Sequence, residues 1–147
     1  MIDKIMNKIL KWSASKMAKA IKQKKISSEE LVQLHLGRIA EVNPKINAIF
    51  KLNDNAMQEA RNADVELARG NTLGPLHGVP FSVKDWLDVT GLPCAGGDVR
   101  HLSRMPKEDA TVVTRLREAG GIILGKTTVT ANSEAYGKVC NPYNLEY

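Results

Sequence analysis

From residue 46 onward, strand-like stretches alternate with stretches that have the helical period, and this alternation limits the fold more than any other feature of the chain. Runs rich in β-branched and aromatic residues predict strands at 46–52, 79–87 and 122–124. Apolar residues at helical spacing predict helices over 54–70 and 109–120. Strands that alternate with helices are typical of an α/β domain. The sequence therefore predicts an α/β domain over 46–147, behind a helical N-terminal segment at 1–45.

The N-terminal segment is strongly basic. Residues 1–25 hold eight lysines against a single acid, Asp3, whereas the whole chain has a net charge of +5. Residues 2–10 combine apolar residues at helical spacing with lysines opposite, which predicts an amphipathic helix. Such a helix either binds a membrane surface or a partner, or packs on its own protein with the lysines in water. The sequence favours the second interpretation and does not establish contact with a membrane or with tRNA.

Single residues predict where the other helices begin, end and face. A second helix is expected from Ser13 or Ser15 to about Lys24. Ser27 and Glu30 have the spacing of a capping box at the start of a third helix. Asn43-Pro44 is expected to end that helix, because the residue before a proline disfavours the α region. The residues of the 109–120 helix expected to face inward are Val112, Val113 and Leu116.

The composition excludes several classes of protein. A chain with 43% hydrophobic and 25% charged residues is globular rather than disordered. Cys94 and Cys140 have no spacing typical of a zinc site or a disulfide framework, and two unpaired cysteines fit a reducing, cytoplasmic setting. No apolar run approaches the length of a transmembrane helix, and the N-terminus lacks the apolar centre of a signal peptide.

Residues 120–127 match the P-loop pattern G-x-x-x-x-G-K-T, but their chemistry does not fit a phosphate-binding loop. A P-loop follows a strand and precedes a helix, whereas a helix is predicted before this segment. Its interior is Ile-Ile-Leu, which is stiff and strand-forming. We therefore expect a strand here, no bound nucleotide, and Lys126 as a structural or surface lysine near the end of the strand.

Lys84 is the residue most suggestive of chemistry. Alternation along the strand at 79–87 places it on one face with Ser82 and Trp86, opposite Val79, Phe81 and Val83. The apolar surroundings predict that Lys84 is buried, and a buried lysine either pairs with an acid or gives up its proton. The alternative is a lysine at the end of a strand that pairs with an acid. Asp85 or Asp88 is expected to hold nearby loops.

The order of motifs from residue 74 onward resembles the amidase signature family. Gly74-Pro-Leu-His-Gly-Val-Pro-Phe-Ser-Val-Lys-Asp85 is similar to that family's lysine segment. Further similar segments follow in the family's order: Asp88-Val-Thr-Gly-Leu-Pro93, Cys94-Ala-Gly-Gly97, Glu108-Asp-Ala-Thr-Val-Val113, Arg115-Leu-Arg-Glu-Ala-Gly120, Ile123-Leu-Gly-Lys-Thr127 and Asn141-Pro-Tyr-Asn144. The resemblance extends from about Ser13 to the end of the chain. It implies an α/β fold with a mixed central sheet flanked by helices, of which this chain is the N-terminal part.

The resemblance also implies amide hydrolysis by a Ser–Ser–Lys triad. A neutral lysine draws a proton through a bridging serine, and a second serine attacks the carbonyl and forms an acyl-enzyme. Lys84 is the one triad member that can be placed in this sequence. The family's bridging serine belongs to a Gly-Gly-Ser-Ser-Gly-Gly segment and its nucleophile to a later Gly-Gly-Ser, and neither segment occurs in these 147 residues. Cys94 with His77 is a weaker nucleophile candidate; loop and turn roles are favoured for these two.

Three functions follow as expectations. The first is an amidase-type hydrolase of small-molecule amides that needs no cofactor, metal or nucleotide, with a homodimer of the full-length enzyme left open. The second is the amidase subunit of a tRNA-dependent amidotransferase, and the third is a non-catalytic remnant or binding module. The chain by itself is expected to be inactive, because triad members act as a unit. It is also expected to be poorly soluble, because strand 122–124 would lack neighbours and present unpaired edges.

Overall fold

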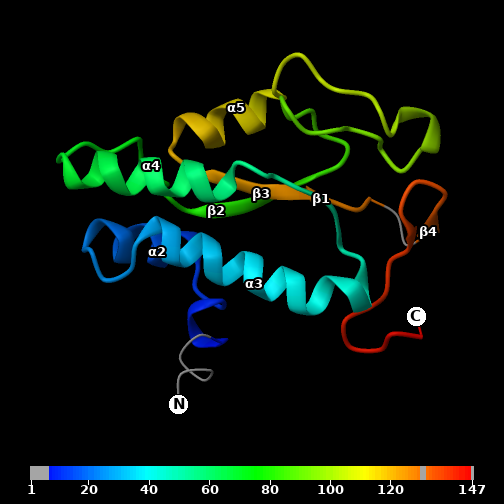
Figure 1. Cartoon of the computed structure of the whole chain (residues 1–147), viewed down its shortest axis with the longest axis horizontal. Coiled ribbons are helices and arrows are strands. Elements are labelled where there is room, and N and C mark those ends of the chain that lie inside the picture. Colours follow the sequence, from blue (N-terminus) through cyan, green and yellow to red (C-terminus); the bar gives the residue numbers. More distant parts are fainter. Residues whose placement is uncertain (1–6, 130–131, 147) are drawn as a thin grey trace.

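A three-stranded mixed sheet forms the centre of the chain (Figure 1). The computed structural model describes residues 7–129 and 132–146. In chain order the elements are α2 (Ala14–Lys22), α3 (Ser28–Ile46), β1 (Ile49–Leu52), α4 (Ala56–Ala68), β2 (Pro80–Lys84), the short 3-10 helix η1 (Val99–His101), α5 (Thr111–Glu118), β3 (Ile122–Thr127), β4 (Asn132–Ser133) and β5 (Gly137–Lys138). The predicted α/β class with a mixed sheet is confirmed.

Strand β3 lies in the middle of the sheet, antiparallel to β1 and parallel to β2. It is buried from Ile122 to Lys126, as a central strand covered on both faces should be. The expectation that this strand would lack neighbours is therefore wrong, because two strands from much earlier in the chain pair with its two edges. The prediction of poor solubility loses its physical basis for the same reason.

Helices cover both faces of the sheet. On one face, α3 and α4 pack Val32 and the alanines Ala56, Ala60 and Ala63 against Ile122 and Leu124 of β3. On the other face, Val113 of α5 packs with Ile123 and Val83. Figure 1 shows α2 and α3 on one side of the sheet and α5 on the opposite side. The small alanine side chains of α4 allow it to lie close to α3 and β3.

The capping box predicted at Ser27 is confirmed. The Ser27 hydroxyl accepts from the Glu30 N–H at 2.9 Å, and the Glu30 carboxylate accepts from the Ser27 N–H at 2.8 Å. A second carboxylate, Asp64 of α4, accepts from the N–H groups of Ser28 and Glu29. These bonds satisfy helix donors that would otherwise be unpaired and tie α3 to α4.

The expected end of α3 at Asn43-Pro44 is wrong. The helix continues through Pro44 to Ile46 and ends where Asn47 adopts the left-handed conformation, at φ 51°. Pro44 lies in the last turn, where its missing N–H costs only one helical hydrogen bond. The Asn43 side chain exchanges two hydrogen bonds with the backbone of Ile49, which fixes the connection to β1.

Other element bounds differ from the predicted ones. Strands β1 and β2 are shorter than expected, whereas β3 continues beyond the predicted end, to Thr127. In α5, Val113 is buried, but Val112 is 47% exposed, so its predicted inward orientation is wrong. A helix of eight residues packed on one side buries a narrow stripe, and adjacent positions cannot both lie in it.

Within the described residues, no helix combines the length and the hydropathy needed to cross a bilayer. The predicted division of the chain at residue 45 stays a prediction.

Candidate functional site

Lys84 is the last residue of β2, and its side chain is exposed. The alternation along β2 is confirmed, because Ser82, Lys84 and Trp86 are exposed while Val79 and Val83 are buried. The expectation that Lys84 itself is buried is wrong for this chain. No described segment covers this face at the end of β2. The Lys84 ammonium lies 4.8 Å from the centre of the Trp86 ring, a cation–π contact.

Lys126 is the lysine that the fold buries completely. Its Nζ lies 2.9 Å from Asp85 Oδ1 and donates to the carbonyl oxygens of Leu87, at 2.8 Å, and Pro93, at 3.2 Å. Two of the three ammonium donors therefore have carbonyl acceptors, and the ion pair with Asp85 balances the charge. The prediction of a strand rather than a phosphate loop is confirmed, since residues 122–127 form β3. Of the two roles expected for Lys126, structural or surface, the structure supports the structural one, because the side chain is fully buried.

Asp85, the residue after Lys84, is the centre of a buried hydrogen-bond cluster. Its side chain points to the opposite face of the strand and is fully buried. Besides the Lys126 pair, its Oδ2 accepts from the N–H groups of Ala95, at 3.0 Å, and Gly96, at 2.8 Å, and from the Tyr136 hydroxyl. The expectation that Asp85 holds a nearby loop is confirmed. We call Asp85, Lys126 and Tyr136 the Asp85 cluster.

Tyr136 joins the C-terminal hairpin to this cluster. Its hydroxyl donates to Asp85 and accepts from the Gly97 N–H at 2.6 Å, and the centres of its ring and the Phe50 ring are 4.7 Å apart. Burial, with the hydrogen bond to the Asp85 carboxylate, raises the pKa of the Tyr136 hydroxyl above its ordinary value. Tyr136 is not among the residues predicted from the sequence, because nothing in its neighbourhood indicates a partner 51 residues away. The available signal was Asp85 itself, a carboxylate placed by alternation on an apolar face.

The loop after β2 is held by a second, more exposed ion pair. Arg104 donates two hydrogen bonds to Asp88, at 2.6 and 2.8 Å. The guanidinium lowers the pKa of the Asp88 carboxyl to about 2. Together with the Asp85 cluster, this pair fixes the loop over 91–108, which the sequence left without regular structure.

The weaker Cys94–His77 pair is not assembled. The Cys94 thiol donates to the Asp85 carbonyl oxygen at 3.2 Å, and burial raises its pKa, which makes it a poor nucleophile. The two ring nitrogens of His77 bond instead to the Leu73 N–H and the Ala63 carbonyl oxygen. His77 therefore has a structural role in the turn before β2.

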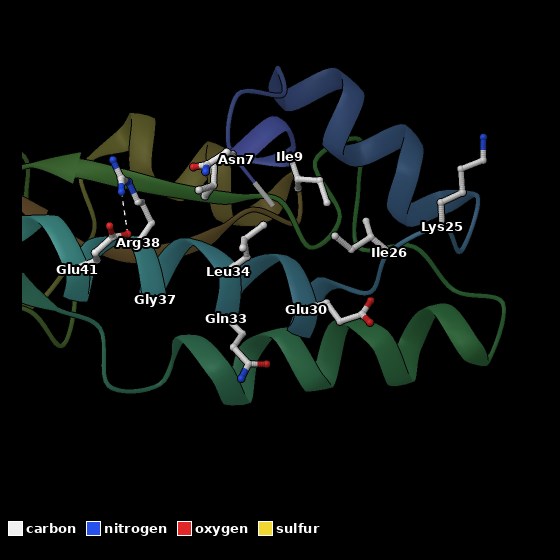
Figure 2. Close-up of a pocket in the computed structure, with 11 residues that line it drawn as sticks. Asn7, Ile9, Lys25, Ile26, Glu30, Gln33, Leu34, Gly37, Arg38 and Glu41 are labelled. Atoms are coloured by element: carbon white, nitrogen blue, oxygen red, sulfur yellow. Dashed lines mark hydrogen bonds and ion pairs between the residues drawn. The ribbon is translucent and has the colours of Figure 1, made fainter. Parts of the chain in front are cut away.

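A cavity of the protein lies away from Lys84. It is a groove of about 960 Å³ between residues 7–10 and α3, with Ile9, Ile26 and Leu34 on its walls and charged residues at its rim (Figure 2). Figure 2 shows the Arg38 and Glu41 side chains paired at one end. Across 7–129 and 132–146, no three histidine, cysteine, aspartate or glutamate side chains gather as a metal site would require.

Comparisons with known proteins agree on one family. The family described as Amidase matches residues 30–147. The chain is 39% identical to a glutamyl-tRNA(Gln) amidotransferase subunit from Cutibacterium acnes, over 96% of this chain and 30% of that protein. It is 36% identical to an acylamidase of Rhodococcus erythropolis, over 92% of this chain and 30% of that protein. Among solved structures, the peptide amidase of Stenotrophomonas maltophilia superimposes with a TM-score of 0.85 at 29% identity, covering 92% of this chain and 31% of that one.

The match covers most of this chain but only part of each relative. The chain spans about 30% of the length of the curated relatives that it matches. The family match covers most of this chain, including β2 with Lys84 and the Asp85 cluster. This chain belongs to the amidase family.

Proposed function

We propose that this chain supplies the base, Lys84, for the hydrolysis of a small-molecule amide by a Ser–Ser–Lys triad. The two serines come from polypeptide outside these 147 residues, so the chain alone has no amidase activity. The observation that carries the proposal is the position of Lys84. It ends β2 in the segment most similar to the family's lysine segment, and it points away from the Asp85 cluster into open space.

The local structure supports this role by separating two lysines. Lys126 neutralises Asp85 at 2.9 Å, so the carboxylate next to Lys84 in the sequence is already paired on the other face of the sheet. No carboxylate within the described residues forms an ion pair with Lys84. An amine without an acidic partner can be uncharged once water is removed from around it, whereas an ion-paired amine stays charged.

The proposed chemistry requires a dry face. A serine hydroxyl is a weak nucleophile and needs a base within hydrogen-bond reach. In this chain the Lys84 amine lies 4.8 Å from the centre of the Trp86 ring, a cation–π contact. Base activity therefore requires that further polypeptide cover this face and bring the bridging serine within about 3 Å of Nζ.

A chimera tests the proposal. This chain replaces the matched part of the Rhodococcus erythropolis acylamidase, which then supplies the two serine segments. The chimera is expected to hydrolyse a simple acyl amide, and Lys84→Ala is expected to lower kcat by about 10³-fold or more, because triad members act together. Lys45→Ala, a change of an exposed lysine at the end of α3, is the matched control and should leave the rate within about twofold.

Two results would count against the proposal. One is a folded, active chimera whose rate does not depend on Lys84. The other is Lys84-dependent turnover of a simple amide by the 147-residue chain alone, which would show that the serines are not needed. Circular dichroism and urea unfolding of each variant separate loss of chemistry from loss of folding.

A second candidate is the amidase subunit of a tRNA-dependent amidotransferase. It is favoured by the 39% identity to the amidotransferase subunit from Cutibacterium acnes. The same segment exchange into that protein distinguishes the two. Release of ammonia from glutamine is measured for the exchanged amidotransferase protein. Ammonia release by that protein, with an inactive acylamidase chimera, would favour the amidotransferase role.

A non-catalytic binding module is the remaining alternative, because Lys84 is exposed and the serine segments are absent from these residues. Inactivity of both exchanged proteins, each correctly folded, would favour that role.

A further inference from the structure

A ridge of lysines runs along the N-terminal part of the molecule, remote from Lys84. Each of its side chains is exposed. We call these residues the lysine ridge: Lys8, Lys11, Lys16, Lys19, Lys22, Lys24 and Lys25. Lys16, Lys19 and Lys22 form its centre, on the side of α2 opposite the buried Met17 and Ile21. The centre of the ridge therefore follows from the amphipathic pattern of α2.

The charge of the ridge is not neutralised by the part of the chain that the structure describes. Residues 7–28 contain no aspartate or glutamate. None of the seven lysines forms an ion pair with a described carboxylate, although α3 and α4 next to it carry pairs such as Arg61–Glu29 and Arg69–Glu66. Seven positive charges within residues 8–25 repel one another, and an anionic partner would relieve this repulsion.

Over residues 13–25 the surface offers charge without an apolar anchor. Met17, Ala20 and Ile21 are buried, and Ile9 and Trp12 pack against the same core cluster. A helix that inserts into a bilayer surface needs apolar side chains facing the lipid. Among residues 13–25 the exposed side chains are serine, lysine, glutamine and one alanine. This composition disfavours a membrane and favours a partner recognised by its negative charge alone.

We propose that the lysine ridge binds the phosphate backbone of a nucleic acid without sequence preference. Lys16, Lys19 and Lys22 recur every three residues, which places them about 4.5 Å apart along the axis of α2. Successive phosphates of one strand advance by about 3.4 Å along a duplex, a difference that long lysine side chains can accommodate. Val79 packs against Met17 and Ile21 of α2. Five residues of extended chain, about 16 Å, separate Val79 from Lys84, so binding at the ridge is independent of the proposed amidase site.

Fluorescence anisotropy tests the proposal with two variants of equal net charge. Lys16→Gln/Lys19→Gln/Lys22→Gln removes the centre of the ridge, and Lys45→Gln/Lys107→Gln/Lys138→Gln removes three exposed lysines elsewhere. The probes are a labelled single-stranded RNA of about 20 nucleotides, a DNA duplex of the same length, and vesicles of phosphatidylserine and phosphatidylcholine. The 147-residue chain is titrated at several salt concentrations, and circular dichroism checks that each variant is folded.

We expect the chain to bind RNA or DNA with Kd near or below about 10⁻⁴ M at physiological salt. The ridge variant should bind at least about tenfold more weakly, with a salt dependence reduced by about two units of slope, while the control variant stays within about threefold. Binding to RNA alone or to DNA alone shows which nucleic acid the lysine ridge prefers. Equal losses in the two variants, no measurable binding to either nucleic acid, or binding to vesicles only would overturn the proposal.

Discussion

Lys84 and Lys126 lie one register position apart on adjacent strands, yet their surroundings are opposite. In the parallel pairing of β2 and β3, Lys126 is opposite Val83 and Lys84 is opposite Thr127. Paired residues share a face of the sheet, so the two lysines point to different sides. Lys126 is fully buried among Asp85 and two carbonyl oxygens, whereas Lys84 is exposed beside Trp86.

The comparison shows that a strand pattern decides the direction of a lysine but not its burial. A buried ammonium is tolerated when its charge is paired and its protons find acceptors, and Lys126 has an ion pair with Asp85 and two carbonyl acceptors. Lys84 has none of these contacts within the described residues. Lys126 therefore holds the fold together, whereas Lys84 is the base of the proposed function.

Removing Lys126 should have the largest effect. Lys126→Met leaves Asp85 buried without its counter-charge, and breaking a buried pair in this way costs about 3–5 kcal/mol. Urea unfolding at neutral pH measures this loss, and Lys84→Met serves as the matched change, expected to cost about 0.5 kcal/mol or less. The double variant Lys126→Met/Asp85→Asn should recover part of the loss, because no charge then stays buried. Equal destabilisation by the two single changes would refute the structural role of Lys126.

Removing the Tyr136 hydroxyl should have an intermediate effect. Tyr136→Phe keeps the ring against Phe50 but deletes the group that joins Asp85 to the Gly97 N–H, at a cost of about 1–2 kcal/mol.

The pH dependence of that cost identifies its source. The pKa of the Tyr136 hydroxyl is raised above its ordinary value of about 10, so the folded state holds this proton more tightly than the unfolded state. The contribution is complete below about pH 10 and is lost as the pH rises further. Urea unfolding from about pH 7 to 11 should show the gap between wild type and variant narrowing above about pH 10; a constant gap would assign the cost to packing.

The smallest effect concerns the exposed pair of Asp88 and Arg104. Because the pKa of Asp88 is lowered to about 2, its contribution to stability is present above about pH 4 and is lost as the pH falls toward 2. The side chains are 34% and 47% exposed, so solvent limits the contribution to about 1 kcal/mol or less. Arg104→Gln should remove this part of the acid dependence, and about 1 M salt should weaken it in the wild type. If the free energy of unfolding of the variant falls with acid as much as that of the wild type, the pair contributes nothing to stability.

Local features of the fold were predictable because they depend on neighbours in the sequence. The capping box at Ser27 and the faces of β2 follow from residues three or fewer positions apart. The end of α3 was not predictable in the same way, because Asn43 bonds to the backbone of Ile49 and the helix tolerates Pro44 in its last turn. Val112 was misplaced because a short helix buries fewer positions than its apolar residues suggest.

The same distinction between local features and long-range contacts applies to the candidate site. The sequence by itself determined the α/β class, a strand at 122–124 in place of a phosphate loop, and the face of β2 on which Lys84 lies. Only the tertiary structure decided which lysine is buried and that Tyr136 meets Asp85 across 51 residues. The physical reason is that periodicity fixes the side to which a side chain points, whereas its burial and charge depend on which distant segments fold against that side.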